Sequence, residues 1–207
     1  RRNEQLADAA ERSAVIADWM GAVPYPKEAL NDAWKRFLWH QFHDDLTGTS
    51  IWEAYTYSWN DEFLAQGQFC DVILASAGAA ASVMDTRAKG SPVLVYNPAA
   101  YSRRSLVEAT VDLPAEAEGV AVYAPDGKTV PAQIVARDGA RATVLFAAAM
   151  EPVSYAVYDV RAGKAGKGKV LRASGNTLEN RVYKVTLDAN GDIASVIDKR
   201  NGRDLVE

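Results

Sequence analysis

In the first part of the chain, apolar residues recur every three or four positions, which is the spacing of amphipathic helices. This pattern predicts a first helix that ends at Gly21, a second helix over 27–42, and a third helix over 50–84. Ser50 is followed three residues later by Glu53, so we expect a capping box at the start of the third helix.

From Pro92 onward, short runs rich in β-branched residues alternate with turn signals such as Asp138-Gly139. The first predicted strands are 93–96, 106–113, 120–123, 130–135, 142–147 and 154–160. The stretch 162–169, with its three Gly and three Lys, predicts a surface loop. Beyond it, residues 182–187 and 193–197 flank an Asn-Gly turn and predict a β-hairpin.

The predicted fold class is α+β, with an N-terminal three-helix bundle over 1–88 followed by an incomplete antiparallel β-sandwich-like domain over 89–207. The sequence does not begin with Met, so we expect that residue 1 is not the natural start. It stops at Glu207, just after a hairpin-like Asn-Gly pair, so we expect the sheet to be cut short.

Composition excludes several classes of function. No apolar run approaches the roughly 18 residues of a membrane span, and no signal peptide pattern opens the chain. The net charge is −4 with dispersed Lys and Arg, which argues against a nucleic-acid partner. Cys70 is the single cysteine, so an internal disulfide and a cysteine-based zinc site are both excluded. The compartment stays open, and a soluble, cytoplasmic location is the preferred expectation.

The candidate chemistry lies where the second predicted helix ends. Its face away from the apolar stripe is polar at first and then carries Trp39, Phe42 and His43, so we expect this end to meet another domain. His43 is followed by Asp44 and Asp45, and an imidazole beside carboxylates can bind metals and hydroxyl groups. One histidine cannot make a zinc site, so further ligands would have to come from elsewhere.

A structural interpretation of the same residues stays open. A His-Asp pair before Gly48 is typical of a helix C-terminus, where the dipole favours the imidazole and glycine ends the helix. His40, the other histidine, is expected to be a packed core or interface residue. Trp34, Trp39, Trp52 and Trp59 stand at helical spacing and are expected in the core, although Trp39 and Trp52 are also candidates for stacking on sugars.

Four segments, in the same order, resemble the glycoside hydrolase family 38 α-mannosidases. Residues 41–50, QFHDDLTGTS, resemble a segment of the family's middle domain, and residues 93–98, VLVYNP, resemble the strand that follows its helices. Residues 180–187 and 191–199 resemble two later β segments, with Val182 in place of an aromatic residue and Val196 as a mild departure.

The resemblance implies a retaining, zinc-dependent hydrolase of terminal α-mannosides. It implies that His43 is one zinc ligand, that Asp44 contacts sugar hydroxyls, and that Thr47, Gly48 and Thr49 shape the turn. Asp45 falls at a variable motif position and is expected to be a helix-end or surface carboxylate. The remaining zinc ligands, the nucleophile and the general acid belong to a preceding α/β barrel domain of the family. No segment here resembles that domain, so this chain is expected to hold no catalytic residue.

We therefore expect a part of an enzyme that is inactive and binds no zinc by itself. On a helix, the adjacent His43 and Asp44 side chains should diverge by about 100° and chelate one ion poorly. The expected partners are the missing barrel domain of the same chain and a mannoside substrate, with no nucleic acid and no membrane; homo-oligomerisation stays open. The alternatives are a non-catalytic carbohydrate-binding or scaffold module, and a freestanding interaction protein.

Overall fold

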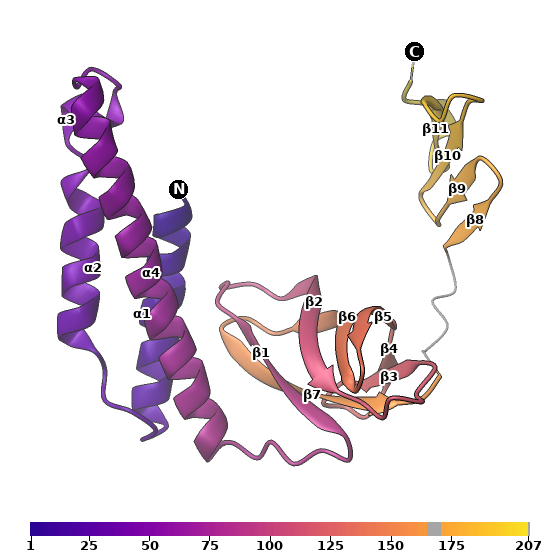
Figure 1. Ribbon diagram of the computed structural model, residues 1–207, viewed down its shortest axis with the longest axis horizontal. Helices are drawn as coiled ribbons and strands as arrows, with labels where there is room; N and C mark the ends of the chain where they lie inside the picture. Colours follow the sequence, from indigo (N-terminus) through magenta and orange to yellow (C-terminus); the bar gives the residue numbers. More distant parts are fainter. Residues whose placement is uncertain (165–170, 207) are drawn as a thin grey trace. The chain divides into compact units, whose positions relative to one another are not determined.

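The computed structural model describes residues 1–164 and 171–206, and the chain forms two compact units, Arg1–Lys164 and Ala165–Glu207 (Figure 1). Helices come first and antiparallel strands follow, which confirms the predicted α+β class. The last helix ends at Val83 and the first strand begins at Ser91. Residues 165–169 of the predicted surface loop lie outside the described residues.

Three long helices and one short helix make up the N-terminal region. They are α1 (Arg2–Trp19), α2 (Lys27–Trp39), α3 (His43–Leu46) and α4 (Trp52–Val83). The predicted second helix was too long, because α2 ends at Trp39 and residues 40–42 form a turn before α3. The predicted capping box was wrong. The N-cap of α4 is Ile51, and the Ser50 hydroxyl donates instead to Asp45 Oδ1, 2.9 Å away, as a charge-assisted hydrogen bond.

Small and large side chains alternate in the core of the helices. α1 contributes mainly alanines, which let the helix axes approach closely, while α2 and α4 contribute the bulky residues Leu30, Phe37 and Phe69. The Trp34 ring lies edge-on to Phe69 with centroids 5.8 Å apart, and its Nε1 donates to Glu11 Oε1 at 2.6 Å. This core holds α2 against α4, and both helices lead to the turn that contains α3.

Two antiparallel sheets follow and share one apolar core. One sheet has the order β1 (Ser91–Asn97), β7 (Ser154–Ala162), β3 (Val120–Tyr123) and β4 (Thr129–Val130), and the other has the order β2 (Arg103–Asp112), β6 (Arg141–Met150) and β5 (Ala132–Asp138). Alternate residues of β6 are buried, as expected for a strand with one face on a core. The core includes Val122 and Tyr158 from the first sheet and Val144 and Phe146 from the second.

The predicted strand over 130–135 is two strands that belong to different sheets. β4 pairs with β3, whereas β5 pairs with β6, and Pro131 lies between them. Proline has no N–H to donate to a ladder, so it suits the point where the chain leaves one sheet for the other.

The second unit is a five-stranded antiparallel sheet. Its strands are β8 (Arg172–Ser174), β9 (Thr177–Glu179), β10 (Tyr183–Leu187), β11 (Ile193–Asp198) and β12 (Arg203–Asp204). β10 and β11 form the predicted hairpin, and Gly191 in its turn has a φ of +89°, which glycine adopts without strain. The short strands β8, β9 and β12 were not predicted, because two or three residues carry too little periodicity to detect.

Candidate functional site

The candidate site is the turn that joins α2 to α4, with α3 at its centre (Figure 1). His43 is the first residue of α3, so it does not end the second helix as expected, although the four-residue α3 helix does end just before Gly48. The α3 helix has four residues, and Thr47 is its C-cap. Gly48 follows with a φ of +81°, a conformation that only glycine adopts cheaply, so the chain can reverse here toward α4.

His43 and Asp44 both face solvent. The exposed fractions of their side chains are 76% and 51%, and His43 Nε2 lies 3.7 Å from Asp44 Oδ2. The expected divergence of the two side chains was wrong, because a residue in the first turn of a helix has no preceding turn to restrict its rotamer. The Phe42 ring packs beside the imidazole with centroids 4.2 Å apart. The turn therefore presents an imidazole and a carboxylate together.

The backbone of the turn is held by the Asp44 carbonyl oxygen. The amides of Thr49 and Ser50 both donate to this oxygen at 3.0 Å, and the Tyr55 hydroxyl on α4 donates to it at 3.3 Å. The Thr47 hydroxyl donates to the His43 carbonyl, and the Thr49 hydroxyl donates to Asp44 Oδ1 at 3.2 Å. The threonines thus shape the turn, as the sequence motif led us to expect.

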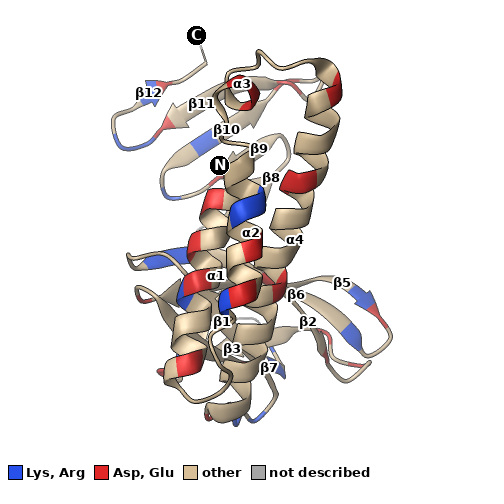
Figure 2. Cartoon of the chain, turned by 90° about the vertical axis from the view of Figure 1, so that its left-hand side faces the viewer, with Lys and Arg blue, Asp and Glu red and all other residues tan. Residues whose placement is uncertain are grey.

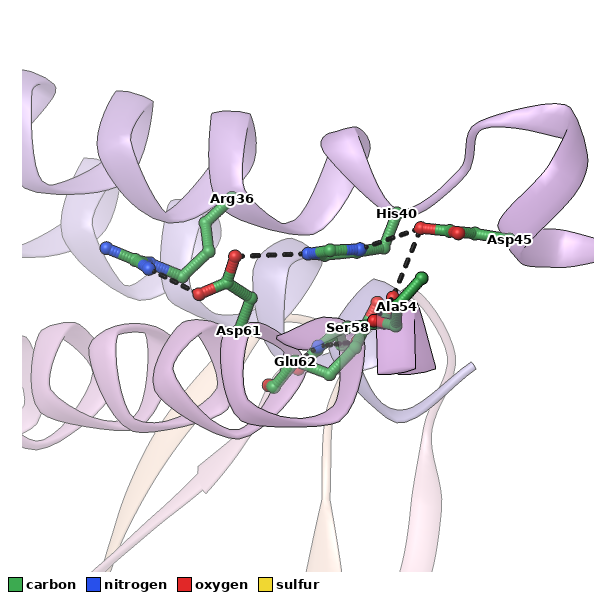
Figure 3. A network of polar contacts seen from close by, with 8 residues as sticks. Arg36, His40, Asp45, Ala54, Ser58, Asp61 and Glu62 are labelled. Atoms are coloured by element: carbon green, nitrogen blue, oxygen red, sulfur yellow. Dashed lines mark hydrogen bonds and ion pairs between the residues drawn. The ribbon is translucent and has the colours of Figure 1, made fainter. Parts of the chain in front are cut away.

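Behind the turn, His40 lies between two carboxylates (Figure 3). The residue is 8% exposed, in keeping with the predicted core role. Its Nδ1 lies 3.0 Å from Asp45 Oδ2, and its Nε2 lies 3.1 Å from Asp61 Oδ2. Arg36 Nη1 donates to the other oxygen of Asp61 at 2.7 Å. Because both ring nitrogens face carboxylates, the imidazolium form satisfies both contacts.

These contacts shift the pKa values of the groups involved. Burial by itself lowers the pKa of His40, but the hydrogen bonds to Asp45 and Asp61 outweigh it and raise the pKa above its ordinary value. The hydrogen bond from His40 lowers the pKa of Asp61, and the hydrogen bond from Arg36 adds to this effect. Both shifts favour the charged forms, a cation at His40 facing an anion at Asp61.

Asp45 lies near the end of the short α3 helix, as one of the two sequence interpretations expected, but it is not a surface carboxylate, since its side chain is only 16% exposed. Besides His40, it accepts hydrogen bonds from the hydroxyls of Ser50 at 2.9 Å and Ser58 at 3.1 Å. It therefore connects α3 to both long helices. Sequence analysis missed Asp61, since only the packing of α2 on α4 brings it beside His40.

Large aromatic residues surround the turn and are open to solvent in this chain. Trp39, Trp52 and Trp59 are 77%, 74% and 66% exposed, so the expectation of four core tryptophans was wrong for all but Trp34. A hollow of about 620 Å³ lies beside one of them, Trp39, and is lined by Trp39, His40, Phe42, Asp45, Ala54, Tyr57 and Ser58. Figure 2 shows acidic and basic residues interspersed along α1 and α2.

The donor set of this chain fits one part of a zinc site. Zinc takes imidazole and carboxylate ligands and needs at least three from the protein. His43 and Asp44 are accessible, but within 1–164 and 171–206 no group of three His, Cys, Asp or Glu side chains is close enough to hold a metal ion. His40 is turned away from the turn's surface and engaged by Asp45 and Asp61. A metal ion bound at His43 would therefore need ligands from outside the described residues.

The helical region matches a known family. Residues 1–77, which include α3 and its turn, match the family model described as "Alpha mannosidase middle domain". One of the four segments that led to this expectation, residues 41–50, lies inside the matched range.

Two solved structures resemble the whole chain. One is an alpha-mannosidase from Enterococcus faecalis V583, with 22% identity, a TM-score of 0.73, and coverage of 99% of this chain and 28% of that one. The other is a protein in the glycosyl hydrolase family 38 from Enterococcus faecalis, with 22% identity, a TM-score of 0.73, and coverage of 98% and 29%. The likeness shows that the middle domain and the strands after it share the fold of these proteins. The chain spans less than a third of the length of either relative.

No curated protein sequence matched this chain. Among the described residues, no helix combines the length and apolar character needed to cross a membrane.

Proposed function

We propose that this chain is the middle domain and the adjoining β region of a retaining, zinc-dependent α-mannosidase. The carrying observation is the exposed His43 and Asp44 pair on a braced turn, within residues that match the α-mannosidase middle domain. One solved relative is named an alpha-mannosidase, and its fold extends over nearly all of this chain. Terminal α-mannosides are the proposed substrates.

In this proposal His43 supplies one zinc ligand and a preceding α/β barrel domain supplies the others. The exposed imidazole suits this role because a ligand shared between domains must be reachable from outside its own domain. Zinc, when bound with an open position, would hold two neighbouring hydroxyls of the sugar ring. The Asp44 carboxylate would accept hydrogen bonds from sugar hydroxyls beside the metal.

The bond-breaking groups are proposed to lie outside this chain. Retention needs a nucleophilic carboxylate and a general acid about 5–5.5 Å apart on either side of the glycosidic bond. Asp45 and Asp61 are engaged with His40, and Asp44 is proposed for binding, so we assign none of them to this pair. The chain alone is therefore proposed to be inactive.

The aromatic end of the helices is proposed to be the surface that receives the barrel domain. Trp39, Phe42 and Trp52 are exposed around the turn, and large apolar patches of this kind mark contact surfaces. The relatives are more than three times as long as this chain, which leaves room for such a domain. Closure over this surface would also remove water from the site.

The test replaces His43 by Ala in the intact enzyme and measures bound zinc together with turnover of an aryl α-mannoside. Both should be lost, while the melting temperature of the protein stays within the range of a surface substitution. Lys35→Ala, an exposed change on α2, is the matched control and should keep both. A His43→Ala enzyme with normal zinc content and turnover would refute the proposal.

The competing function is a non-catalytic module that binds carbohydrate through aromatic surfaces. The exposed rings of Trp39, Trp52 and Trp59 favour it, because such rings can stack on sugars. Titration of the 207-residue chain with mannosides, followed by tryptophan fluorescence, separates the two. Saturable quenching that Trp52→Ala abolishes, together with an intact protein that shows no turnover, would favour the binding module.

A further inference from the structure

The turn that carries His43 has little helix of its own to stiffen it. The α3 helix has four residues, and no side chain caps its N-terminus. The position of His43 therefore depends on contacts between the turn and the long helices. The side chain that makes most of them is Asp45, two residues after His43, which is joined to His40, Ser50 and Ser58.

His40 fastens Asp45 to α4. An imidazole ring is rigid and carries its two nitrogens on separate edges, so it can hold two carboxylates at fixed positions. Here one nitrogen faces Asp45 of α3 at 3.0 Å and the other faces Asp61 of α4 at 3.1 Å (Figure 3). Arg36, one turn earlier on α2, holds Asp61 from its other oxygen at 2.7 Å.

We propose that His40 is a positioning residue for His43: the Asp61–His40–Asp45 chain of contacts fixes the α3 turn and so sets the place of the metal-binding imidazole. The inference rests on the proposed function, since it assumes that His43 binds zinc. His40 itself does not touch the metal. It acts through the backbone between Asp45 and His43, in the way that outer partners orient metal ligands.

Removing the His40 ring should loosen the turn and weaken the metal site together. Without the cation between them, Asp45 and Asp61 lose a hydrogen bond each and face one another with like charge. Ligand geometry must hold within fractions of an ångström for full affinity. We expect the zinc affinity of the intact enzyme to fall about tenfold or more in His40→Ala, the usual effect of losing an outer partner.

The experiment measures three quantities on intact enzyme: zinc affinity by competition with a chelator, amide hydrogen exchange of the peptide 42–51, and the melting temperature. The variants are His40→Ala and the milder Asp61→Asn, which keeps the size of the side chain. Two controls lie further along α4. Asp71→Asn makes the same chemical change at an exposed position, and Val72→Ala removes buried volume and lowers stability away from the turn.

The proposal expects faster exchange in 42–51 and weaker zinc binding in His40→Ala and Asp61→Asn, with wild-type values for both quantities in the controls. Should His40→Ala fail to fold, Asp61→Asn decides the matter. The proposal is overturned if zinc affinity falls in proportion to the melting temperature in every variant, so that Val72→Ala weakens zinc binding as much as His40→Ala or Asp61→Asn does. It is also overturned if zinc affinity and exchange are unchanged in the folded His40 and Asp61 variants.

The two levels of inference fail in different ways. A His43→Ala enzyme that keeps its zinc contradicts the proposed function, whatever the His40 variants do. Loss of zinc in His43→Ala combined with wild-type affinity in His40→Ala and Asp61→Asn contradicts only the positioning role of His40.

Discussion

Nδ1 of His40 lies 3.0 Å from Oδ2 of Asp45, although the turn before α3 and the start of α3 separate the two residues in the chain. His40 is the C-cap of α2, and Asp45 lies in the third position of α3. This one contact therefore links the end of α2 to α3 across the turn between them. It leaves the intervening His43 pointing outward, where a second domain could reach it.

We expect the cluster of His40 and its two carboxylates to make the free energy of unfolding depend on pH in two separate pH ranges. The pKa of His40 is raised above 6.5, so its contribution to the free energy of unfolding is complete below pH 6.5 and is lost as pH rises through the folded-state pKa. The pKa of Asp61 is lowered below 3.8, so its contribution is present above pH 3.8 and is lost as pH falls through its folded-state pKa. Their joint contribution is greatest between these values.

Two measurements check this pH dependence. NMR titration of the His40 ring should give a pKa above 6.5, and the denaturation midpoint should fall as pH rises through that pKa. In Asp61→Asn the ring loses one anionic partner, so its pKa should move down. A His40 that titrates below 6.5 in the folded protein would contradict the expectation.

Asp44→Asn should separate substrate binding from metal binding. The amide keeps the size of the side chain but loses the charge that strengthens hydrogen bonds to sugar hydroxyls, each worth about 1.5–3 kcal/mol. We expect kcat/KM of the intact enzyme for an aryl α-mannoside to fall roughly 10- to 150-fold, while zinc content stays normal. Loss of zinc along with activity would instead make Asp44 a metal ligand. Unchanged kcat/KM would remove Asp44 from the site.

The 207-residue chain by itself should bind zinc weakly and turn over no mannoside. Its described residues offer no group of three suitable side chains, and ligand number with mutual positioning supplies most of the affinity of a zinc site. Equilibrium dialysis against zinc and an assay on an aryl α-mannoside measure the two properties, with the intact enzyme as positive control. Tight stoichiometric zinc in the chain, or zinc-stimulated turnover, would contradict this expectation.

Two leucines on α2, one buried and one exposed, allow a matched test of how much the helix core contributes to stability. Leu30 is buried between the helices, and Leu38 is exposed two turns later. Leu30→Ala leaves a cavity and should lower the free energy of unfolding by about 2–5 kcal/mol. Leu38→Ala should change it by no more than about 0.5 kcal/mol. Chemical denaturation of both variants tests the assignment, and equal losses would mean that α2 presents a different face to the core.

Prediction from the sequence succeeded where a local pattern sufficed. The order of helices before strands follows from a change in hydrophobic period, and the β10–β11 hairpin follows from its Asn-Gly turn. It failed where the outcome depended on a distant partner. Ser50 was expected to cap α4, but its hydroxyl turns to Asp45. Pro131 divides a run that looks like one strand, because the two halves belong to different sheets.

The sequence by itself determined the α+β class and the four motifs that pointed to the α-mannosidases, one of which, at 41–50, lies within the residues that match their middle domain. Only the tertiary structure decided what His40, Asp45 and Asp61 do. Asp61 stands 21 residues beyond His40, and their contact exists because the core between α2 and α4 aligns the two helices at this height. The local pattern shows which face of a helix is apolar. Which polar side chains pair across two packed helices depends on how the helices are aligned and on where each of them ends.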